Sequence, residues 1–341
     1  MMGDTVWEKR APHRSNLPPP SAEVGRIIRV THDGDGLFAP RMMSDRANAW
    51  LRGESAFVFA GSQQTGGARF FHVDLLTGES VPQNFIFPYG GETEGWSWLP
   101  DGSVLVLDGP RLRRVHPFNG VDDVVLDIRN THPGCDLWQP HASDDGLTYS
   151  ATVRQIIESG PYLKIGTVTI HNGKQEYWPA VGVLDESQVR RDGRGVLIKE
   201  DRGQGDDNRY IDLDTRETKW LKDQERAVQH SDCGPDFVVG EADKPDPGGC
   251  VIWQLDRLNE APRFLFPSTN MGYVSVRGGR CLWSSDTHLS LVALDGSGIT
   301  PLIEHGGYGS GYDDRVKANL DPTGQVACYM VHGSVYLMRV A

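Results

Sequence analysis

Histidines stand out in two stretches of the sequence. One stretch reads Val228-Gln229-His230-Ser231-Asp232, and the other, residues 131–141, holds His132 and His141 nine residues apart. An imidazole changes its charge near neutral pH, so it can act as a general acid or base, and it is also a common metal ligand. The two stretches therefore predict a site for proton transfer or metal binding, with His230 and His141 as its first candidates.

Side chains that could bind an anionic, ring-shaped ligand lie elsewhere in the chain. Lysine and arginine form charge-assisted hydrogen bonds with a carboxylate, and tryptophan can stack against the face of a sugar ring. Besides the two histidines, the candidates for catalysis are Lys317, Arg190 and Tyr273. The candidates for substrate binding are Trp96, Trp138, Gln139, Lys164, Gln188, Arg315 and Asn319. The alternative for each residue is that a water-lined position simply tolerates a polar side chain.

The elements that position these residues come from a repeat built on a tight turn. Residues 98–107 (WLPDGSVLVL) read as a short strand, an Asp-Gly turn and a second strand, which is the pattern of a β-hairpin. The turn glycine recurs at intervals of 41–49 residues, at Gly53, Gly102, Gly146, Gly193, Gly234, Gly278 and Gly324. A period of roughly 40–50 residues with several strands in each unit is typical of a β-propeller. Seven turns predict an all-β, seven-bladed β-propeller.

The two ends of the chain predict how this ring closes. Six repeats have a fourth, outer strand, but the seventh stops at Ala341 without one, whereas residues 26–30 form an extra strand ahead of the first repeat. That strand can complete the last blade, which leaves no unpaired sheet edge. We therefore expect the propeller to span residues 25–341, with residues 1–24 as an irregular, proline-containing arm.

In a propeller the first strand of each blade lines the central channel. Most of the candidate residues fall in the leading part of a predicted first strand. We therefore expect them to converge at one mouth of the channel, where they would form a binding site for a polar, anionic ligand.

The composition limits the partners and the compartment. The formal net charge of −12 argues against a nucleic-acid surface, which needs a basic patch. No stretch approaches the ~20 apolar residues that span a bilayer, and residues 1–10 lack the apolar segment of a secretory signal. The five cysteines include no C-x-x-C pair. We expect a reduced, cytoplasmic setting, with no membrane and no nucleic-acid partner; the oligomeric state stays open.

The start of the array resembles the oligogalacturonate lyase family. The resemblance lies in residues 31–38 (THDGDGLF), 57–61 (FVFAG) and 73–79 (VDLLTGE), and looser TolB-like propeller repeats are similar too. It implies a seven-bladed, mostly cytoplasmic propeller that cleaves short pectic uronides by β-elimination. It also implies a role for His230, which stands where the family has a metal-binding histidine. Lys164 falls near the position of an arginine implicated in the family's catalysis.

The sequence departs from the family pattern at two strand starts. Where the family has further metal ligands, in a Gln-x-x-His-x-His run, this chain has residues 314–319 (DRVKAN). Where the family has a catalytic histidine, this chain has Glu186-Ser187-Gln188. The ammonium group of Lys317 would repel a cation. We therefore expect a relative that works without the metal and with no cofactor, and a divalent cation is the alternative.

These observations predict a carbon–oxygen lyase whose substrate is a uronic-acid-containing oligosaccharide. β-Elimination needs positive charge at the carboxylate, a base for the α-proton and an acid for the leaving oxygen. Lys317, Arg190 and Lys164 could supply the charge, and His230 and His141 the base and acid, with Tyr273 in reserve.

Two other functions stay open. One is a propeller that binds a carbohydrate or a protein without catalysis. The other is a glycoside hydrolase, which needs two carboxyl groups about 5–10 Å apart. Candidates for such a pair are Glu94, Asp136, Glu186, Asp232 and Asp314.

Overall fold

The fold is all-β, as the sequence predicts. The computed structural model describes residues 25, 27–30, 37–41, 56–63, 68–74, 80–87, 96–116, 122–157, 162–203, 206–221, 228–242, 248–258, 260–267, 272–285, 288–304, 317–331 and 334–341. These residues form antiparallel four-stranded sheets and one short 3₁₀ helix, η1 (Leu255–Arg257). The predicted arm, residues 1–24, lies outside the described residues.

Seven such sheets are found in the described residues, numbered here in chain order. Sheet one is β2 (Leu37–Arg41), β3 (Ala56–Gln63), β4 (Ala68–Asp74) and β5 (Ser80–Phe87). Sheet two is β6 (Trp96–Trp98), β7 (Val104–Asp108), β8 (Arg111–Val115) and β9 (Asp122–Asp127). Sheet three is β10 (Cys135–Ala142), β11 (Tyr149–Gln155), β12 (Leu163–His171) and β13 (Lys174–Pro179). Sheet four is β14 (Val183–Val189), β15 (Gly195–Asp201), β16 (Asp206–Asp212) and β17 (Thr218–Trp220).

The last three sheets continue the pattern. Sheet five is β18 (Val228–Cys233), β19 (Phe237–Ala242), β20 (Gly249–Gln254) and β21 (Arg263–Pro267). Sheet six is β22 (Gly272–Arg277), β23 (Arg280–Ser285), β24 (His288–Val292) and β25 (Ile299–Glu304). Sheet seven is β26 (Lys317–Leu320), β27 (Val326–Val331), β28 (Ser334–Arg339) and β1 (Ile27–Arg29). In sheet seven, therefore, a strand from the other end of the chain pairs with β28, with Ile28 opposite Leu337.

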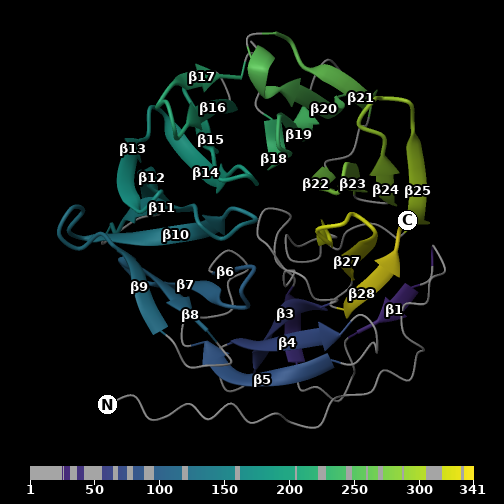
Figure 1. The fold of residues 1–341 in the computed structure, drawn as a ribbon, viewed down its shortest axis with the longest axis horizontal. Helices are drawn as coiled ribbons and strands as arrows, with labels where there is room; N and C mark the ends of the chain where they lie inside the picture. Colours follow the sequence, from purple (N-terminus) through teal and green to yellow (C-terminus); the bar gives the residue numbers. More distant parts are fainter. Residues whose placement is uncertain are drawn as a thin grey trace.

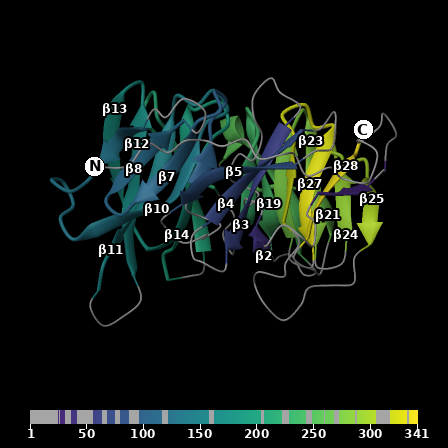
Figure 2. The same cartoon turned by 90° about the horizontal axis from the view of Figure 1, so that it is seen from below.

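The sheets follow one another around a common centre (Figure 1). The first strands β10, β14, β18 and β22 lie toward the centre, and the fourth strands β13, β17, β21 and β25 lie at the rim (Figure 1). Seen from the edge, the sheets form a disc (Figure 2). Because each first strand is followed by the same hairpin order, the first strands run in one direction, and their ends lie on one face of the disc.

The core lies between neighbouring sheets. Tyr210 of sheet four packs with Val238 and Trp253 of sheet five, and further clusters join the other described neighbours. Sheets three to six are therefore covered on both faces, and in sheet two the strand β7 (VLVLD) is buried at every position. This explains why many strands read as continuous apolar runs rather than as alternating patterns.

The repeated turn glycines are explained by backbone conformation and by contacts between sheets. Gly193 has a φ of +75°, and a Cβ placed on it would lie 2.7 Å from Thr148 Oγ1 of sheet three. Gly278 has a φ of +55°, and its Cβ would lie 2.1 Å from the Thr323 carbonyl oxygen of sheet seven. A side chain would collide with the adjoining sheet at both turns, so the repeat requires glycine there.

Candidate functional site

Two of the first strands carry the same irregularity. In β10 the register shifts between Trp138 and His141, and in β18 it shifts between Gln229 and Asp232. At these bulges Gln139 has a φ of +48° and His230 a φ of +46°, values that residues other than glycine seldom adopt. A bulge changes the direction of the side chains that follow it, and strained residues of this kind often lie at functional sites. The sequence had already singled out both residues.

His230 lies between a carboxylate and an aromatic ring. Its Nδ1 is 3.1 Å from Glu241 Oε2 on the adjacent strand β19, and both side chains are buried. The ring of Tyr273, from β22 of the next sheet, packs against the imidazole with a centroid distance of 4.2 Å. Since a carboxylate can only accept a hydrogen bond, Nδ1 donates, and the neutral ring carries its lone pair on Nε2. The structure thus brings together two of the predicted catalytic residues, His230 and Tyr273.

Gln188 supports this part of the site from sheet four. Its Nε2 donates to the carbonyl oxygen of Ser231 at 2.9 Å and lies 3.1 Å from the Ser231 hydroxyl. Gln188 is buried, and Ser231 directly follows His230. The predicted substrate-binding amide therefore ties β14 to the bulge of β18.

His141 is held by the backbone of the next sheet. The Val189 N–H donates to His141 Nδ1 at 3.2 Å, and the imidazole is buried. Because Nδ1 accepts this hydrogen bond, the neutral ring has its proton on Nε2. His141 and His230 therefore have opposite tautomers.

Gln139 is half-buried and lies next to two buried hydroxyl groups. Its Oε1 lies 3.5 Å from Thr152 Oγ1 of the adjacent strand β11, and Thr152 Oγ1 in turn lies 3.3 Å from Ser187 Oγ of sheet four. Thr152 therefore links the amide of Gln139 to the neighbouring sheet.

Trp138 stacks on an arginine that the sequence analysis did not include among the site residues. The guanidinium carbon of Arg154 lies 4.1 Å from the Trp138 ring centroid and 4.0 Å from that of Tyr162. One face of Trp138 is thus covered by a cation, which is attracted to the π face of the ring.

Two lysines share one carboxylate next to this group. Lys199 Nζ lies 2.7 Å from Asp185 Oδ2, and Lys164 Nζ donates to the Asp185 carbonyl oxygen and lies 3.8 Å from Oδ1. Lys164 is also the cross-strand neighbour of Arg154. Arg154, Lys164 and Lys199 therefore bring three positive charges to the region where sheets three and four meet.

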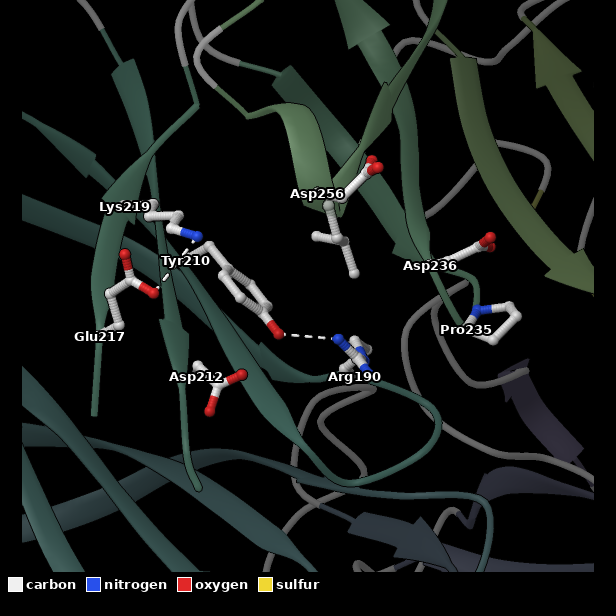
Figure 3. Close-up of a pocket in the computed structure, with 9 residues that line it drawn as sticks. Arg190, Tyr210, Asp212, Glu217, Lys219, Pro235, Asp236 and Asp256 are labelled. Atoms are coloured by element: carbon white, nitrogen blue, oxygen red, sulfur yellow. Dashed lines mark hydrogen bonds and ion pairs between the residues drawn. The ribbon is translucent and has the colours of Figure 1, made fainter. Parts of the chain in front are cut away.

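Arg190 directly follows β14 and lines a hollow at the surface of sheet four. Its Nη1 donates to the Tyr210 hydroxyl at 2.8 Å (Figure 3), and its guanidinium is also paired with Asp192. The hollow has a volume of about 270 Å³, and Asp236, in the turn after β18, and Asp256 of η1 also line it (Figure 3). His141, His230 and Tyr273 do not line this hollow. Burial raises the pKa of Tyr210 to about 12, so its hydroxyl stays protonated beside Arg190.

The remaining predicted residues lie in the core or outside the described part. Trp96 and Asn319 are buried, with exposed fractions of 3% and 0%. Lys317 is the first residue of β26, but the structure describes only its backbone. Arg315 lies outside the described residues.

Glu241, Arg154 and Lys199 are the site residues that the sequence analysis missed. Each is a charged residue inside a strand whose other positions are largely buried. An ionisable side chain in such a strand needs a charged or hydrogen-bonding partner. That signal could have identified Glu241 in the strand Phe237–Ala242 (FVVGEA).

The described side chains do not provide a metal site. Among them there is no group of three or more His, Cys, Asp or Glu residues that could hold a metal ion. The Nδ1 of His230 faces Glu241, so a cation at this histidine would be bound by Nε2.

No helix in the described ranges has the length and apolarity to cross a membrane.

Comparison with solved structures identifies the fold. An oligogalacturonate lyase in complex with manganese is 14% identical in sequence and has a TM-score of 0.71, covering 98% of this chain and 96% of its own. An oligogalacturonate lyase from Vibrio parahaemolyticus is 11% identical, with a TM-score of 0.72 and 99% of each chain covered. The β-propeller domain of Cps50 (Swd1) from Myceliophteria thermophila is 11% identical, with a TM-score of 0.55, 90% of this chain and 97% of that chain. No family profile and no curated protein matches the sequence. At these identities the likeness shows the fold alone: this chain is a β-propeller protein, similar in fold to the oligogalacturonate lyases.

Proposed function

We propose that this protein is a lyase that cleaves a uronic-acid-containing oligosaccharide by β-elimination. The observation that carries the proposal is the group formed by His230, Glu241 and Tyr273, at a strained bulge of a first strand. Two oligogalacturonate lyases share the fold over nearly the whole chain, which supports the same choice.

The proposal includes a complete ring. The seven sheets are its seven blades, and β1 closes it by pairing with β28. In such a ring the first strands surround a central channel, where the substrate binds. We also propose that the protein works in the cytoplasm.

In the proposed reaction, His230 is the base. Its Nε2 takes the proton from the carbon next to the carboxylate, and that electron pair forms a double bond to the neighbouring ring carbon. The bond from this neighbouring carbon to the glycosidic oxygen breaks, and the leaving oxygen takes a proton from the Tyr273 hydroxyl or from water. Glu241 stabilises the imidazolium that forms, because its carboxylate accepts the Nδ1 proton in a charge-assisted hydrogen bond.

The substrate carboxylate needs positive charge during this step. In the proposal Arg154, Lys164 and Lys199 supply this charge; Asp185 pairs with the two lysines, and Arg154 lies over Trp138. In the proposal these cations stabilise the carboxylate as the negative charge spreads onto it. Trp138 is the aromatic surface next to them.

A screen of uronide oligosaccharides tests the proposal. A lyase forms a 4,5-unsaturated uronide, which absorbs in the near ultraviolet, so absorbance should rise with time. His230→Ala should reduce this rate by roughly 10²–10⁴-fold, and His171→Ala, which alters a peripheral histidine, is the matched control. The assay is run with a chelator and with added manganese, because the manganese complex of the similar lyase leaves a divalent cation open.

The other outcomes separate the alternatives. New reducing ends without absorbance would indicate a glycoside hydrolase. Binding of an oligosaccharide without either product would indicate a carbohydrate-binding propeller, in which Trp138 and the cations act without proton transfer. Equal rates for wild type, His230→Ala and His171→Ala would refute the proposed site.

A further inference from the structure

A buried group of charges joins the ends of four successive first strands. Asp144 follows β10, Arg191 follows β14, Asp232 lies in β18 and Arg277 ends β22. The side chains of Arg191 and Arg277 are only 6% and 4% exposed. Because these positions lie at the ends of parallel first strands, the group lies on the face of the disc opposite to the strand starts. We call these four residues the arginine cluster.

Asp232 accepts three hydrogen bonds. Its Oδ2 accepts from Arg191 Nη2 at 2.7 Å and from the Val276 N–H at 2.7 Å. Its Oδ1 accepts from the Cys233 N–H at 2.8 Å. Asp232 therefore balances the charge of Arg191, and Arg277 needs another anion.

Among the described residues, Asp144 is the other carboxylate within reach of the two arginines. Its Oδ1 lies 3.2 Å from Arg277 Nη2 and 3.7 Å from Arg191 Nη1, yet its side chain is 47% exposed. Its backbone is fixed, since the Asp144 N–H donates to the Arg191 carbonyl oxygen at 2.8 Å. Asp144 thus covers the arginines from the solvent side.

Several donors of the two guanidinium groups lack a hydrogen bond within the described part of the chain. They are Nε and Nη1 of Arg191, and Nε and Nη2 of Arg277, which are buried; Asp144 lies within ion-pair distance of Nη1 and Nη2 but does not accept a hydrogen bond from them. A buried donor without an acceptor costs roughly 1–3 kcal/mol, and more when the group is charged. Four such donors on two adjacent cations call for an oxyanion or ordered water.

We propose that Arg191 and Arg277 form a binding site for a small monoanionic carboxylate, with Asp144 as the side chain that covers it. When Asp144 turns to solvent, the two arginines and Asp232 carry a net charge of +1, which one carboxylate neutralises. A planar carboxylate can accept two parallel N–H groups from a guanidinium, which the Asp144 carboxylate does not do here. The binding needs no reaction at His230, so it stands independently of the proposed lyase activity.

Thermal unfolding of Asp144→Ala in formate tests this inference. Formate replaces chloride at constant ionic strength, so that screening does not change. The variant removes the internal carboxylate, and its Tm should rise with the logarithm of the formate concentration above the Kd, by about 2 °C at ten times the Kd. Acetate should act in the same way.

Two matched variants serve as controls. Asp145→Ala changes the neighbouring carboxylate of the same turn, and its Tm should not rise with formate. Asp144→Ala combined with Arg277→Gln should lose the effect. If formate does not stabilise Asp144→Ala, or stabilises all three equally, the inference is wrong and the arginine cluster is only a clamp between sheets. Stronger stabilisation by sulfate or phosphate than by formate would refute the carboxylate class.

NMR of the wild-type protein gives a second measurement. The Nε–H resonances of Arg191 and Arg277 should shift together as formate is added, because the anion must displace Asp144 to reach them. Unchanged resonances up to molar formate would refute the site even if the variants fail to fold.

Discussion

His230 and Glu241 form a buried pair on adjacent strands, with 3.1 Å between Nδ1 and Oε2. They are eleven residues apart in the chain, and the bulge of β18 brings them together. The carboxylate fixes the tautomer of the imidazole and favours its protonated form. Glu241 is therefore a positioning residue for the proposed base, and it gives the first prediction.

Glu241→Gln should lower the lyase rate by roughly 10-fold or more. Without the carboxylate the imidazolium is less stable, so the acidic limb of the pH–rate profile should move to lower pH. The profile of kcat is the measurement. Glu241→Asp, which keeps the charge, should restore part of the wild-type profile. A rate loss with no movement of the acidic limb would show that Glu241 is only a packing residue.

The strained backbone at Gln139 gives a second prediction. At a φ of +48° a side chain is unfavourable, so Gln139→Gly should raise the free energy of unfolding by about 1 kcal/mol. Gln139→Ala keeps the strain and should not stabilise. Urea unfolding measures both variants. Gln155→Gly, in ordinary strand conformation, should destabilise the protein, and a similar loss for Gln139→Gly would contradict the argument. If Gln139 also contacts substrate, both Gln139 variants lose substrate affinity.

Alanine substitutions at two glycines distinguish the stability cost of backbone strain from the cost of a collision between sheets. Gly193 and Gly173 have similar φ angles, +75° and +71°, but a Cβ would meet Thr148 only at Gly193, and nothing lies within 4 Å at Gly173. Gly193→Ala should therefore cost about 2–4 kcal/mol, and Gly173→Ala about 1 kcal/mol. Denaturant unfolding measures the difference. Equal losses would mean that the contact between sheets three and four adds nothing.

The contribution of Asp214 to stability should depend on pH. Hydrogen bonds from His171 and Arg194 hold the pKa of Asp214 below its ordinary value of 3.8. A lowered pKa stabilises the fold above the ordinary value, and this contribution is lost as the pH falls through the lowered pKa. The Tm difference between wild type and Asp214→Asn should therefore shrink as the pH falls from about 5 to about 2. A constant difference would refute the linkage.

The local pattern of the chain determined the sheets. Each turn glycine and its apolar strand act over a few residues, so the repeat of 41–49 residues predicted antiparallel hairpins and their order. The glycines at 102, 146, 193, 278 and 324 all have positive φ, as a tight turn requires. The sequence also pointed to His230, Tyr273 and Gln188, because polar residues at the start of first strands converge when those strands surround a centre.

The tertiary structure alone decided which side chains meet. The contacts of Val189 with His141 and of Arg191 with Asp232 join residues 48 and 41 positions apart, about one repeat. The period shows that such residues lie on neighbouring sheets, but it does not give the side-chain direction. A single extra residue at a bulge reverses which side chains face the neighbouring sheet, and both bulges occur at ordinary residues, Gln139 and His230, rather than at glycine. The direction of Arg190 toward Tyr210 within sheet four, and of Arg191 toward Asp232 of sheet five, depends on tertiary packing, which no local pattern records.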